Sequence, residues 1–328
     1  MKITKEKIKS LSIDKHNALT DGCIPNAGNA ILPDKLLNAL YWKYEREGVK
    51  FSIFIHELRT ILNLKSTKDD DRIYHALQIL ATPMQVRNFK YKNEEIVWAL
   101  VSFIRDATRK KTKQNYIEIE LDEKMISILK EKQGYTVLDI QICNQFKTKY
   151  GLKLYEMYLR YYSLPNKEGK GVGKISKTLD EMNSMFSANY QQPSKLLNMK
   201  HESKTIAPIN RGLNEIEKIT DVIINCFYNK IEKTFTFGWE QIDNYPSLRI
   251  PYKRIEELID WYLYHRQGKL KIKSLPKYRQ TLKSKIINDE FEELDALYCG
   301  MIKHKYNLKS EDYYNVKTGI YKDFKGKL

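Results

Sequence analysis

The apolar positions between residues 33 and 80 recur at spacings of three and four, which is the pattern of amphipathic helices. Gly48 ends the first of three predicted helices, and Ser52 is the predicted cap of the second. The third begins at the aspartates 69–71, whose charge suits the positive end of a helix dipole. The predicted inward positions are Leu36, Leu37, Leu40 and Tyr44; Ile55, Leu58, Ile61 and Leu62; and Ile73, Leu77 and Leu80.

The spacing of the apolar residues changes from a helical to a β-strand pattern after residue 95. Residues 96–104 form an apolar run of the β type, and residues 116–121 alternate strictly between apolar and polar side chains. Between them, residues 105–115 are the predicted tip of a hairpin, with five basic residues and one acid. Three helices followed by a hairpin with a basic tip is the element order of a winged helix, so we predict that fold here.

Residues 149–166 predict a long helix that joins this region to the next. Shorter helical turns are predicted before it, over residues 125–129 and 138–146. Pro165 ends the helix because proline cannot continue its hydrogen bonds. The apolar stripe consists of Leu152, Tyr155, Leu159 and Tyr162, and the polar and basic residues around it are Gln145, Lys147, Lys149, Lys153 and Arg160.

A similar order returns after residue 174. Helices are predicted over residues 175–186 and 200–218, the second starting or kinking at Pro208. Strands over residues 221–228 and 234–239 follow, with a turn between them. The chain therefore repeats a helix, helix, hairpin order.

The predicted fold class is α+β and mostly helical, with two tandem winged-helix domains that have β-hairpin wings. A helical C-terminal tail follows, with apolar stripes over residues 255–263 and 291–302. The predicted parts are a flexible N-terminal arm (residues 1–28), a first winged helix that ends with the joining helix (29–164), a second winged helix (165–250) and a basic helical tail (251–328).

Charge narrows the possible partners. The 328-residue chain has a formal net charge of +16 and a pI near 9.3, and proteins with such an excess usually bind a polyanion. Nucleic acid is the first candidate; an acidic membrane surface is the second, although no basic amphipathic helix favours it. Heavy use of Lys, Ile, Asn and Tyr can also reflect an AT-rich genome, so clustering counts more than the total. Residues 261–288 contain eight basic residues and no acid.

The apolar runs and the cysteines of the sequence indicate the cellular compartment that we expect for the protein. No run of eighteen apolar residues predicts a membrane span, and the basic N-terminus lacks the apolar core of a signal peptide. The four cysteines, Cys23, Cys143, Cys226 and Cys299, are too far apart for a zinc motif or a disulfide framework. We therefore expect a cytoplasmic protein without a membrane contact.

No catalytic motif is present in the sequence. Residues 169–176 (GKGVGKIS) approach a phosphate loop, but the glycines are one residue too close, Ile175 follows the lysine, and no apolar strand precedes them, so a flexible linker is the better interpretation. The six histidines never flank a single residue, as the metal site of a rolling-circle nickase requires. We expect no enzyme, no cofactor and no metal.

The candidate DNA contacts come from the predicted third helix, the basic hairpin tip and the helix after residue 200. Arg, Asn, Ser and Thr on a recognition helix bind base edges, whereas a basic tip suits phosphates or the minor groove. An exposed helix and a solvated turn are the alternative interpretations. The candidates are Arg72, His75, Gln78, Arg105, Arg109, Lys110, Lys111, Lys113, His201, Ser203, Lys204, Thr205, Asn210, Arg211 and Asn214.

Several segments match motifs of one family in order. Residues 151–162 (GLKLYEMYLRYY) are similar to S-x-R-L-Y-E-L-L-x-x-Y, and residues 204–221 (KTIAPINRGLNEIEKITD) to R-x-V-L-x-P-A-x-x-E-I-N-x-x-T-D. Residues 175–186 and 272–282 (IKSLPKYRQTL) match I-x-x-L-x-x-x-L and I-x-N-P-x-x-Y-L-x-x-x-L. The chain thus resembles, over residues 30–285, the replication initiators of iteron-controlled, theta-replicating plasmids. It departs from them at Gly151, where Ser is common, and at residues 201–204, where consecutive basic residues are usual, so no base sequence is inferred.

The resemblance implies monomers that bind direct repeats (iterons) in double-stranded DNA at a plasmid origin and open it for host replication proteins. It also implies a homodimer, in equilibrium with the monomer, that binds an inverted repeat and represses the initiator's own gene. Host initiator and helicase-loading proteins are the implied partners. The alternatives are a winged-helix transcriptional repressor without initiator activity, a partitioning protein that bridges DNA, and a nickase.

Overall fold

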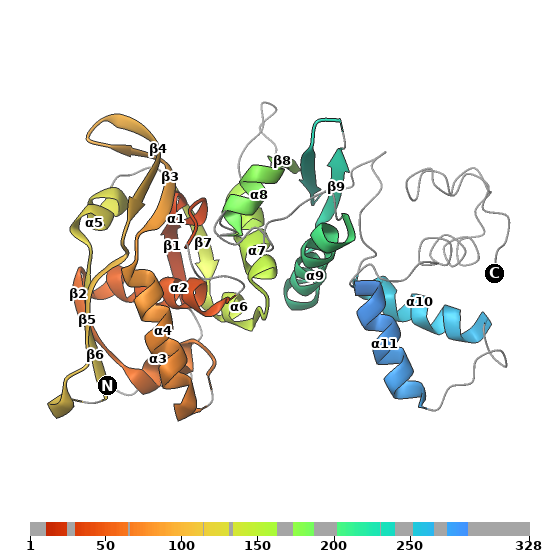
Figure 1. Cartoon of the computed structure of the whole chain (residues 1–328), viewed down its shortest axis with the longest axis horizontal. Coiled ribbons are helices and arrows are strands. Elements are labelled where there is room, and N and C mark those ends of the chain that lie inside the picture. The colour runs from red at the N-terminus through yellow and green to blue at the C-terminus, as the bar shows by residue number, and fades with distance from the viewer. Residues whose placement is uncertain are drawn as a thin grey trace. The chain divides into compact units, whose positions relative to one another are not determined.

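The structure is a computed structural model. It describes residues 11–24, 30–64, 66–113, 115–130, 134–162, 173–186, 202–229, 231–239, 252–265 and 274–287 (Figure 1). The chain divides into two compact units. The first consists of residues 1–172 and 180–196, and the second of residues 173–179 and 197–328.

The first unit contains a winged helix. Its elements are α2 (Leu32–Glu47), β2 (Lys50–Phe54), α3 (Ile55–Ile61), α4 (Asp70–Ala81), β5 (Ile104–Thr108) and β6 (Tyr116–Leu121). The strands form an antiparallel sheet in the order β2, β6, β5. Pro33 lies in the first turn of α2, and Gly48, with φ of 87°, follows its last residue. All the predicted inward residues are buried except Tyr44, which is half-buried, so the three helices are confirmed.

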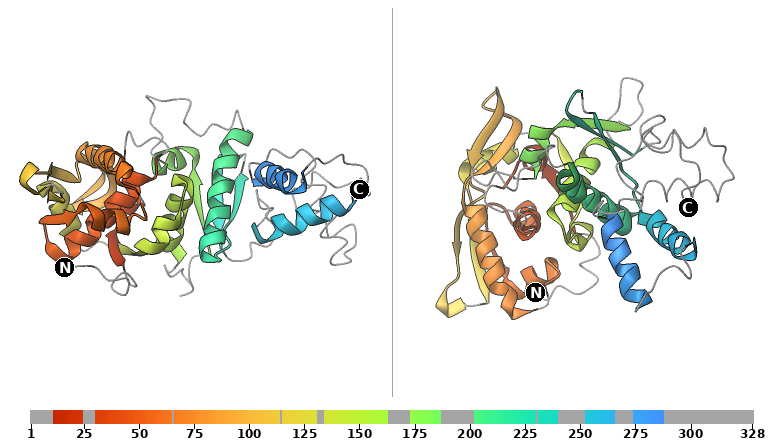
Figure 2. Two further views of the ribbon diagram at one scale, coloured as in Figure 1. Left: turned by 90° about the horizontal axis from the view of Figure 1, so that it is seen from below. Right: turned by 45° about the vertical axis from the view of Figure 1, so that its right-hand side comes forward.

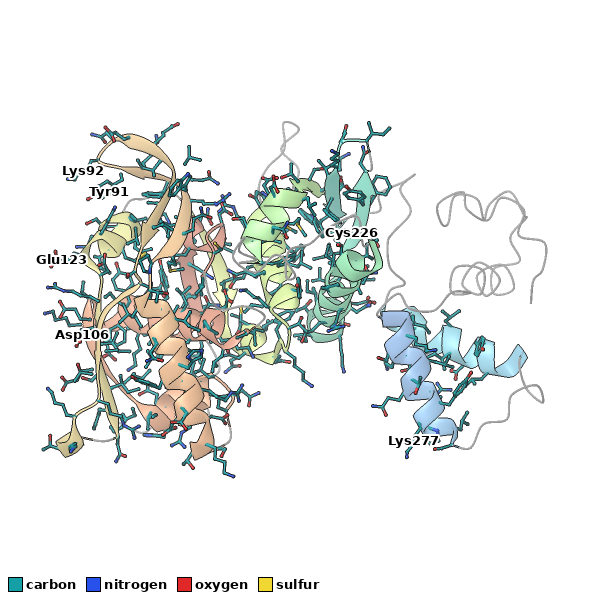
Figure 3. All side chains as sticks on the ribbon, in the orientation of Figure 1. Tyr91, Lys92, Asp106, Glu123, Cys226 and Lys277 are labelled. Carbon is teal, nitrogen blue, oxygen red and sulfur yellow. The ribbon has the colours of Figure 1, made fainter. Side chains whose placement is uncertain are left out.

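One hairpin was missed by the sequence prediction. Strands β3 (Met84–Tyr91) and β4 (Glu94–Val101) pair antiparallel, and the prediction of a single β run over residues 96–104 is wrong because that run is divided between β4 and β5. The turn residues Lys92 and Asn93 have φ of 51° and 68°, as a type I′ turn requires. The hairpin projects from the first unit, with Tyr91 and Lys92 at its tip (Figure 2, Figure 3).

The prediction of a flexible arm over residues 1–28 is wrong for residues 12–20. Strand β1 (Ser12–His16) pairs antiparallel with β7 (Tyr135–Asp139), and α1 (Asn17–Thr20) follows it. Leu138, predicted in a helical turn, lies in β7, and Ser52, predicted as a helix cap, lies in β2. Helices α5 (Glu123–Lys130) and α6 (Ile140–Gln145) flank β7 along the chain.

The predicted joining helix is α7 (Lys149–Tyr162), and its first half is buried except for Tyr150, which is half-buried. Lys153 and Lys149, predicted among its polar surroundings, are 2% exposed. Glu156 has no exposed surface and lies 2.9 Å from the ammonium of Lys15 on β1 and 3.4 Å from that of Lys153. Lys153 in turn lies 3.2 Å from a carboxylate oxygen of Asp34 on α2. We call Lys15, Asp34, Lys153 and Glu156 the buried ion cluster.

The same order of elements follows α7 a second time. It comprises β8 (Lys174–Thr178), α8 (Leu179–Met185), α9 (Glu202–Thr220), β9 (Asn225–Asn229) and β10 (Thr234–Gly238). The sheet order β8, β10, β9 matches β2, β6, β5 of the first copy. With α7 in the place of α2, the chain carries two winged helices in tandem. The predicted helix over residues 175–186 is wrong in its first half, because residues 174–178 form a strand along β10.

Part of the second copy packs within the first unit. The hydroxyl of Ser184 on α8 donates a hydrogen bond of 3.3 Å to Gln85 on β3. The ring of Phe186 meets that of Tyr150 edge-on, with 4.6 Å between centroids. Residues 180–196 accordingly belong to the first unit, although α8 follows β8 in the second winged-helix order.

The predicted helical tail contains α10 (Tyr252–His265) and α11 (Leu275–Ile287), which pack together (Figure 2). Arg279 of α11 forms ion pairs with Glu256 and Asp260 of α10, and Lys283 pairs with Glu256. Two of the basic residues of the acid-free segment therefore hold the tail together. The stripe predicted over residues 291–302 lies outside the described residues. Across the described ranges, no helix is long and apolar enough to cross a membrane.

Candidate nucleic-acid interface

Helix α4 presents the candidates of the predicted third helix to solvent. Its inward side is buried, and Arg72, His75 and Gln78 are exposed on the other side together with Tyr74, which is 63% exposed. Arg72 donates a hydrogen bond of 2.6 Å to Asp69 at the start of the helix, and this bond lowers the pKa of that carboxyl. The helix has the polar exposed face that base reading requires, but it carries aspartates at one end.

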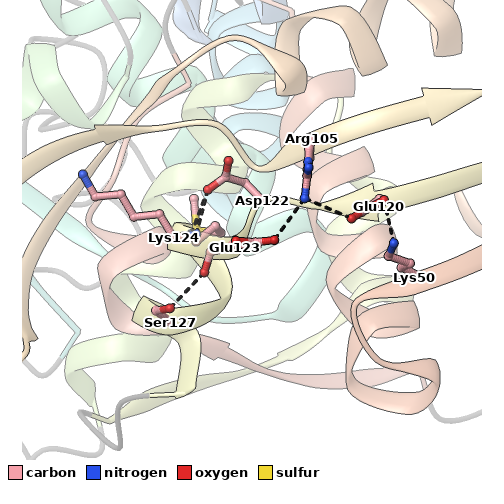
Figure 4. A network of polar contacts seen from close by, with 8 residues as sticks. Lys50, Arg105, Glu120, Asp122, Glu123, Lys124 and Ser127 are labelled. Carbon is pink, nitrogen blue, oxygen red and sulfur yellow. Dashed lines mark hydrogen bonds and ion pairs between the residues drawn. The ribbon is translucent and has the colours of Figure 1, made fainter.

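The first basic candidate of the hairpin β5–β6 is bound to carboxylates of its own unit. Arg105 lies on β5, and its guanidinium contacts Glu120 on β6 at 3.3 Å and Glu123 on α5 at 3.0 Å (Figure 4). Lys50 on β2 lies 3.0 Å from the other oxygen of Glu120. Arg105 therefore ties β5, β6 and α5 together at the surface, a structural role that the sequence did not suggest.

Further basic candidates of this hairpin also have acidic partners. Lys110 lies 2.6 Å from Glu118, and Arg109 lies 3.9 Å from Asp70 at the start of α4. Lys111 is exposed and forms no ion pair with any residue that the structure describes. Lys113 ends the short 3-10 turn of residues 111–113, and its side chain lies outside the description.

The remaining candidates lie on helix α9 or directly before it, and they differ in exposure. Arg211 is exposed, whereas Thr205, Asn210 and Asn214 are between 1% and 4% exposed, so the expectation that these three face solvent is wrong. The reason is spacing: Asn210 lies four residues after Ile206, and Asn214 directly follows Leu213, so both remain on the wide buried side. His201 lies outside the described residues, as do the side chains of Ser203 and Lys204.

Pro208 lies inside α9, which continues from Glu202 to Thr220. The sequence left open whether the helix starts near this proline or is kinked at it. Because α9 extends across it, the first alternative is wrong: the helix begins six residues earlier.

The hairpin β9–β10 is the wing of the second copy, and the sequence predicted it as a hairpin without proposing any residue of its tip as a DNA contact. Phe235 and Phe237 on β10 and Cys226 on β9 are fully buried; Figure 3 labels Cys226. At its tip Ile231 is 93% exposed, the highest value among the large hydrophobic side chains that are described as exposed. The sequence shows an isoleucine among polar residues in this turn, but its exposure becomes known only from the structure.

No group of three or more His, Cys, Asp or Glu residues within the described ranges is arranged to hold a metal ion. The candidate contacts in each unit are therefore basic, polar and apolar side chains on a helix and on a hairpin: α4 and β5–β6 in the first unit, and α9 and β9–β10 in the second. The standard geometry of such elements on DNA is a helix in the major groove with the wing beside it.

Comparison with known proteins gives the following. Residues 12–159 match the family model described as "Initiator Replication protein, WH1". The fold is similar to that of a solved structure titled "Crystal structure of Pi initiator protein in complex with iteron DNA", with a TM-score of 0.50, 14% identity and coverage of 71% of this chain and 99% of that one. A structure of RctB domains 2–3 matches at a TM-score of 0.32, 13% identity and coverage of 63% and 79%. No curated protein matches.

Proposed function

Residues 12–159 carry the WH1 domain of the initiator replication proteins, and from this premise we propose that the chain is a plasmid replication initiator that binds direct repeats at an origin. The observation that carries the proposal is the repeated winged-helix order in a chain whose first copy matches that family. The fold similarity to an initiator that was solved with iteron DNA supports it, as does the net charge of +16.

The mechanism proposed is binding without catalysis. Helices α4 and α9 are the readers of the two copies, and each enters a major groove with its exposed side. The wings contact the backbone and the minor groove and fix the register of each reader. Binding of several copies to adjacent repeats bends the DNA, and that strain lowers the cost of opening AT-rich DNA nearby for host replication proteins. The protein acts in the cytoplasm, where plasmid DNA lies.

A homodimer that represses the initiator's own gene is the second part of the proposal. Within the described residues β4 pairs only with β3, and its other edge remains available for a second strand. Trp98 and Leu100 share one face of β4 and are 56% and 58% exposed, and Val97 on the opposite face is 74% exposed. Pairing of two β4 strands would cover part of these apolar side chains and supply main-chain hydrogen bonds.

Trp98→Asp tests the dimer. We expect the dimer dissociation constant from analytical ultracentrifugation to rise at least about tenfold, because a buried interfacial Trp is replaced by a charge. Binding of monomers to direct repeats should remain. Tyr135→Asp is the matched control, since Tyr135 on β7 is an aromatic residue of the same unit and is 61% exposed. Equal effects of both variants would remove β4 from the interface.

The function itself is tested by footprinting on the DNA that flanks the protein's own gene, followed by replication of an origin plasmid in trans. Regularly spaced protected direct repeats and replication that depends on the protein are the expected results. A single protected operator without replication would instead favour the winged-helix repressor. A cut in supercoiled origin DNA that depends on a divalent metal would contradict the non-catalytic mechanism.

A further inference from the structure

The tip of the hairpin β9–β10 presents one apolar side chain to solvent. Register pairs Thr234 with Asn229, so residues 231–233 lie in the connection between the strands. Ile231 lies at this tip with 93% of its surface exposed. Burying such a side chain against a partner is favourable by about 1.5–3 kcal/mol.

The tip is held in one shape. The side-chain oxygen of Asn229 accepts hydrogen bonds from the backbone amides of Ile231 at 2.9 Å and Glu232 at 3.2 Å. Lys233 adopts a φ of 54°, which lets the chain turn back into β10. Beneath the tip, the ring of Tyr228 packs on that of buried Phe235 with 4.7 Å between centroids. Ile231 is therefore presented on a preorganised turn with little entropy left to lose on binding.

The chemistry around Ile231 favours a nucleic acid. Lys233 is exposed beside it and forms no ion pair with any other residue that the structure describes. Glu232, between Ile231 and Lys233, is also exposed, and its carboxylate accepts a hydrogen bond of 3.4 Å from the hydroxyl of Thr234. An exposed apolar side chain with a cation two residues away matches the arrangement with which minor-groove proteins insert Ile, Leu, Met or Phe between base pairs while cations bind the flanking phosphates. The other hairpin tips differ, since that of β3–β4 is formed by Lys92 and Asn93 and that of β5–β6 is basic.

We infer that Ile231 is a wedge that enters the minor groove of the bound repeat, partly unstacks one base step and fixes the site of the bend. This inference rests on the proposed function and assigns to the second wing a role in DNA distortion. Flexible pyrimidine–purine steps such as TA unstack at least cost, so the wedge would favour repeats that place such a step at the tip.

The test uses the full-length protein and its repeat DNA with 2-aminopurine placed in turn at each adenine, where a rise in fluorescence reports unstacking. Wild-type protein should raise the fluorescence at one step and bend the repeat in a circular-permutation assay. Ile231→Ser should abolish the rise, reduce the bend and weaken binding by about tenfold, while the slope of affinity against salt stays unchanged. Ile223→Ser, at a position 40% exposed before β9, is the matched control and should behave as wild type.

The outcomes separate the inference from the function. If wild-type protein binds no repeat, the proposed function fails. If it binds and bends the repeat and Ile231→Ser does so equally, with the same fluorescence rise, the wedge is overturned. Unchanged distortion combined with lost origin replication would assign the tip to a protein partner and likewise overturn the inference. Because Ile231 packs against almost nothing, circular dichroism of the variant should match that of wild type.

Discussion

The wing β5–β6 carries Arg109 and Lys110, which have carboxylate partners, whereas the wing β9–β10 carries at its tip an isoleucine that is 93% exposed. Exposed ion pairs contribute about 0–1 kcal/mol, so the first wing exchanges its carboxylates for phosphates at little cost. An isoleucine side chain makes no favourable contact with a phosphate, but it can pack against an apolar surface such as the face of a base. The difference suggests that the first wing contributes electrostatic affinity for any DNA, and that the second wing contributes to the distortion of the bound DNA.

The buried ion cluster differs in kind from the interior of the second copy's sheet. The cluster joins Asp34 of α2 in the first copy to Lys153 and Glu156 of α7, whereas the side chains of Phe235, Phe237 and Cys226 on β10 and β9 are buried and uncharged. An apolar core tolerates small shifts, but a buried ion needs its partner at close range. The cluster also joins β1 to α7 across 141 positions of the chain. It therefore fixes the start of the second copy to the body of the first unit.

Glu156→Gln should have the largest effect on this contrast. The change leaves the ammonium groups of Lys15 and Lys153 buried with only Asp34 to balance them, so we expect the free energy of unfolding of the first unit to fall by about 3–5 kcal/mol. Urea denaturation monitored by fluorescence measures it. Glu47→Gln is the matched control, because Glu47 lies 2.7 Å from Lys43 but has a side chain 43% exposed, and its loss should cost less than about 1 kcal/mol.

The pH profile gives the same variant a second readout. Burial by itself would raise the pKa of Glu156, but the charges of Lys15 and Lys153 and the hydrogen bonds from Lys15 and Asn38 lower it to about 2. The unfolded chain binds this proton near pH 4.5, so the stabilisation is complete above that pH and is lost as the pH falls towards 2. Glu156→Gln should lack this part of the acid dependence. A variant with the wild-type profile would show that the cluster does not stabilise the fold.

Arg211→Ala sharpens the comparison between the two reading helices. Among the candidates on α9 whose side chains the structure describes, Arg211 is the exposed one, and an exposed arginine on a recognition helix binds guanine with two hydrogen bonds. We expect binding to the specific repeat to weaken by about 1–3 kcal/mol and binding to random DNA to change much less. Titrations of both DNAs by fluorescence anisotropy measure the ratio. If the ratio stays at its wild-type value, α9 does not read the sequence through this residue.

Helices were easier to predict from the sequence than the parts that join the copies. Spacing identified α2, α3 and α4 because their inward residues are apolar and local. Strand β1 was missed because it buries Lys15, whose partner Glu156 lies far along the chain. Strand β8 was taken for a helix because Ile175 and Leu179 are four residues apart, a spacing that fits either structure. Two roles at the candidate interface could not be predicted from the sequence. The charge of Arg105 suggested a DNA contact, and its carboxylate partners became visible only in the structure. The position of Ile231 in a turn did not reveal that its side chain is exposed.

The smallest expected effect concerns the first wing. Lys110 lies 2.6 Å from Glu118, so this carboxylate competes with DNA phosphates for the ammonium group. Lys110→Ala should weaken binding to all DNA sequences alike and reduce the salt slope by about 1. Glu118→Gln should do the reverse and strengthen binding to specific and random DNA equally, by about 0.2–1 kcal/mol, because an exposed ion pair of this worth no longer has to be broken. A change in the specific-to-random ratio in either variant would mean that the first wing reads sequence, and the division of roles between the two wings would then fail.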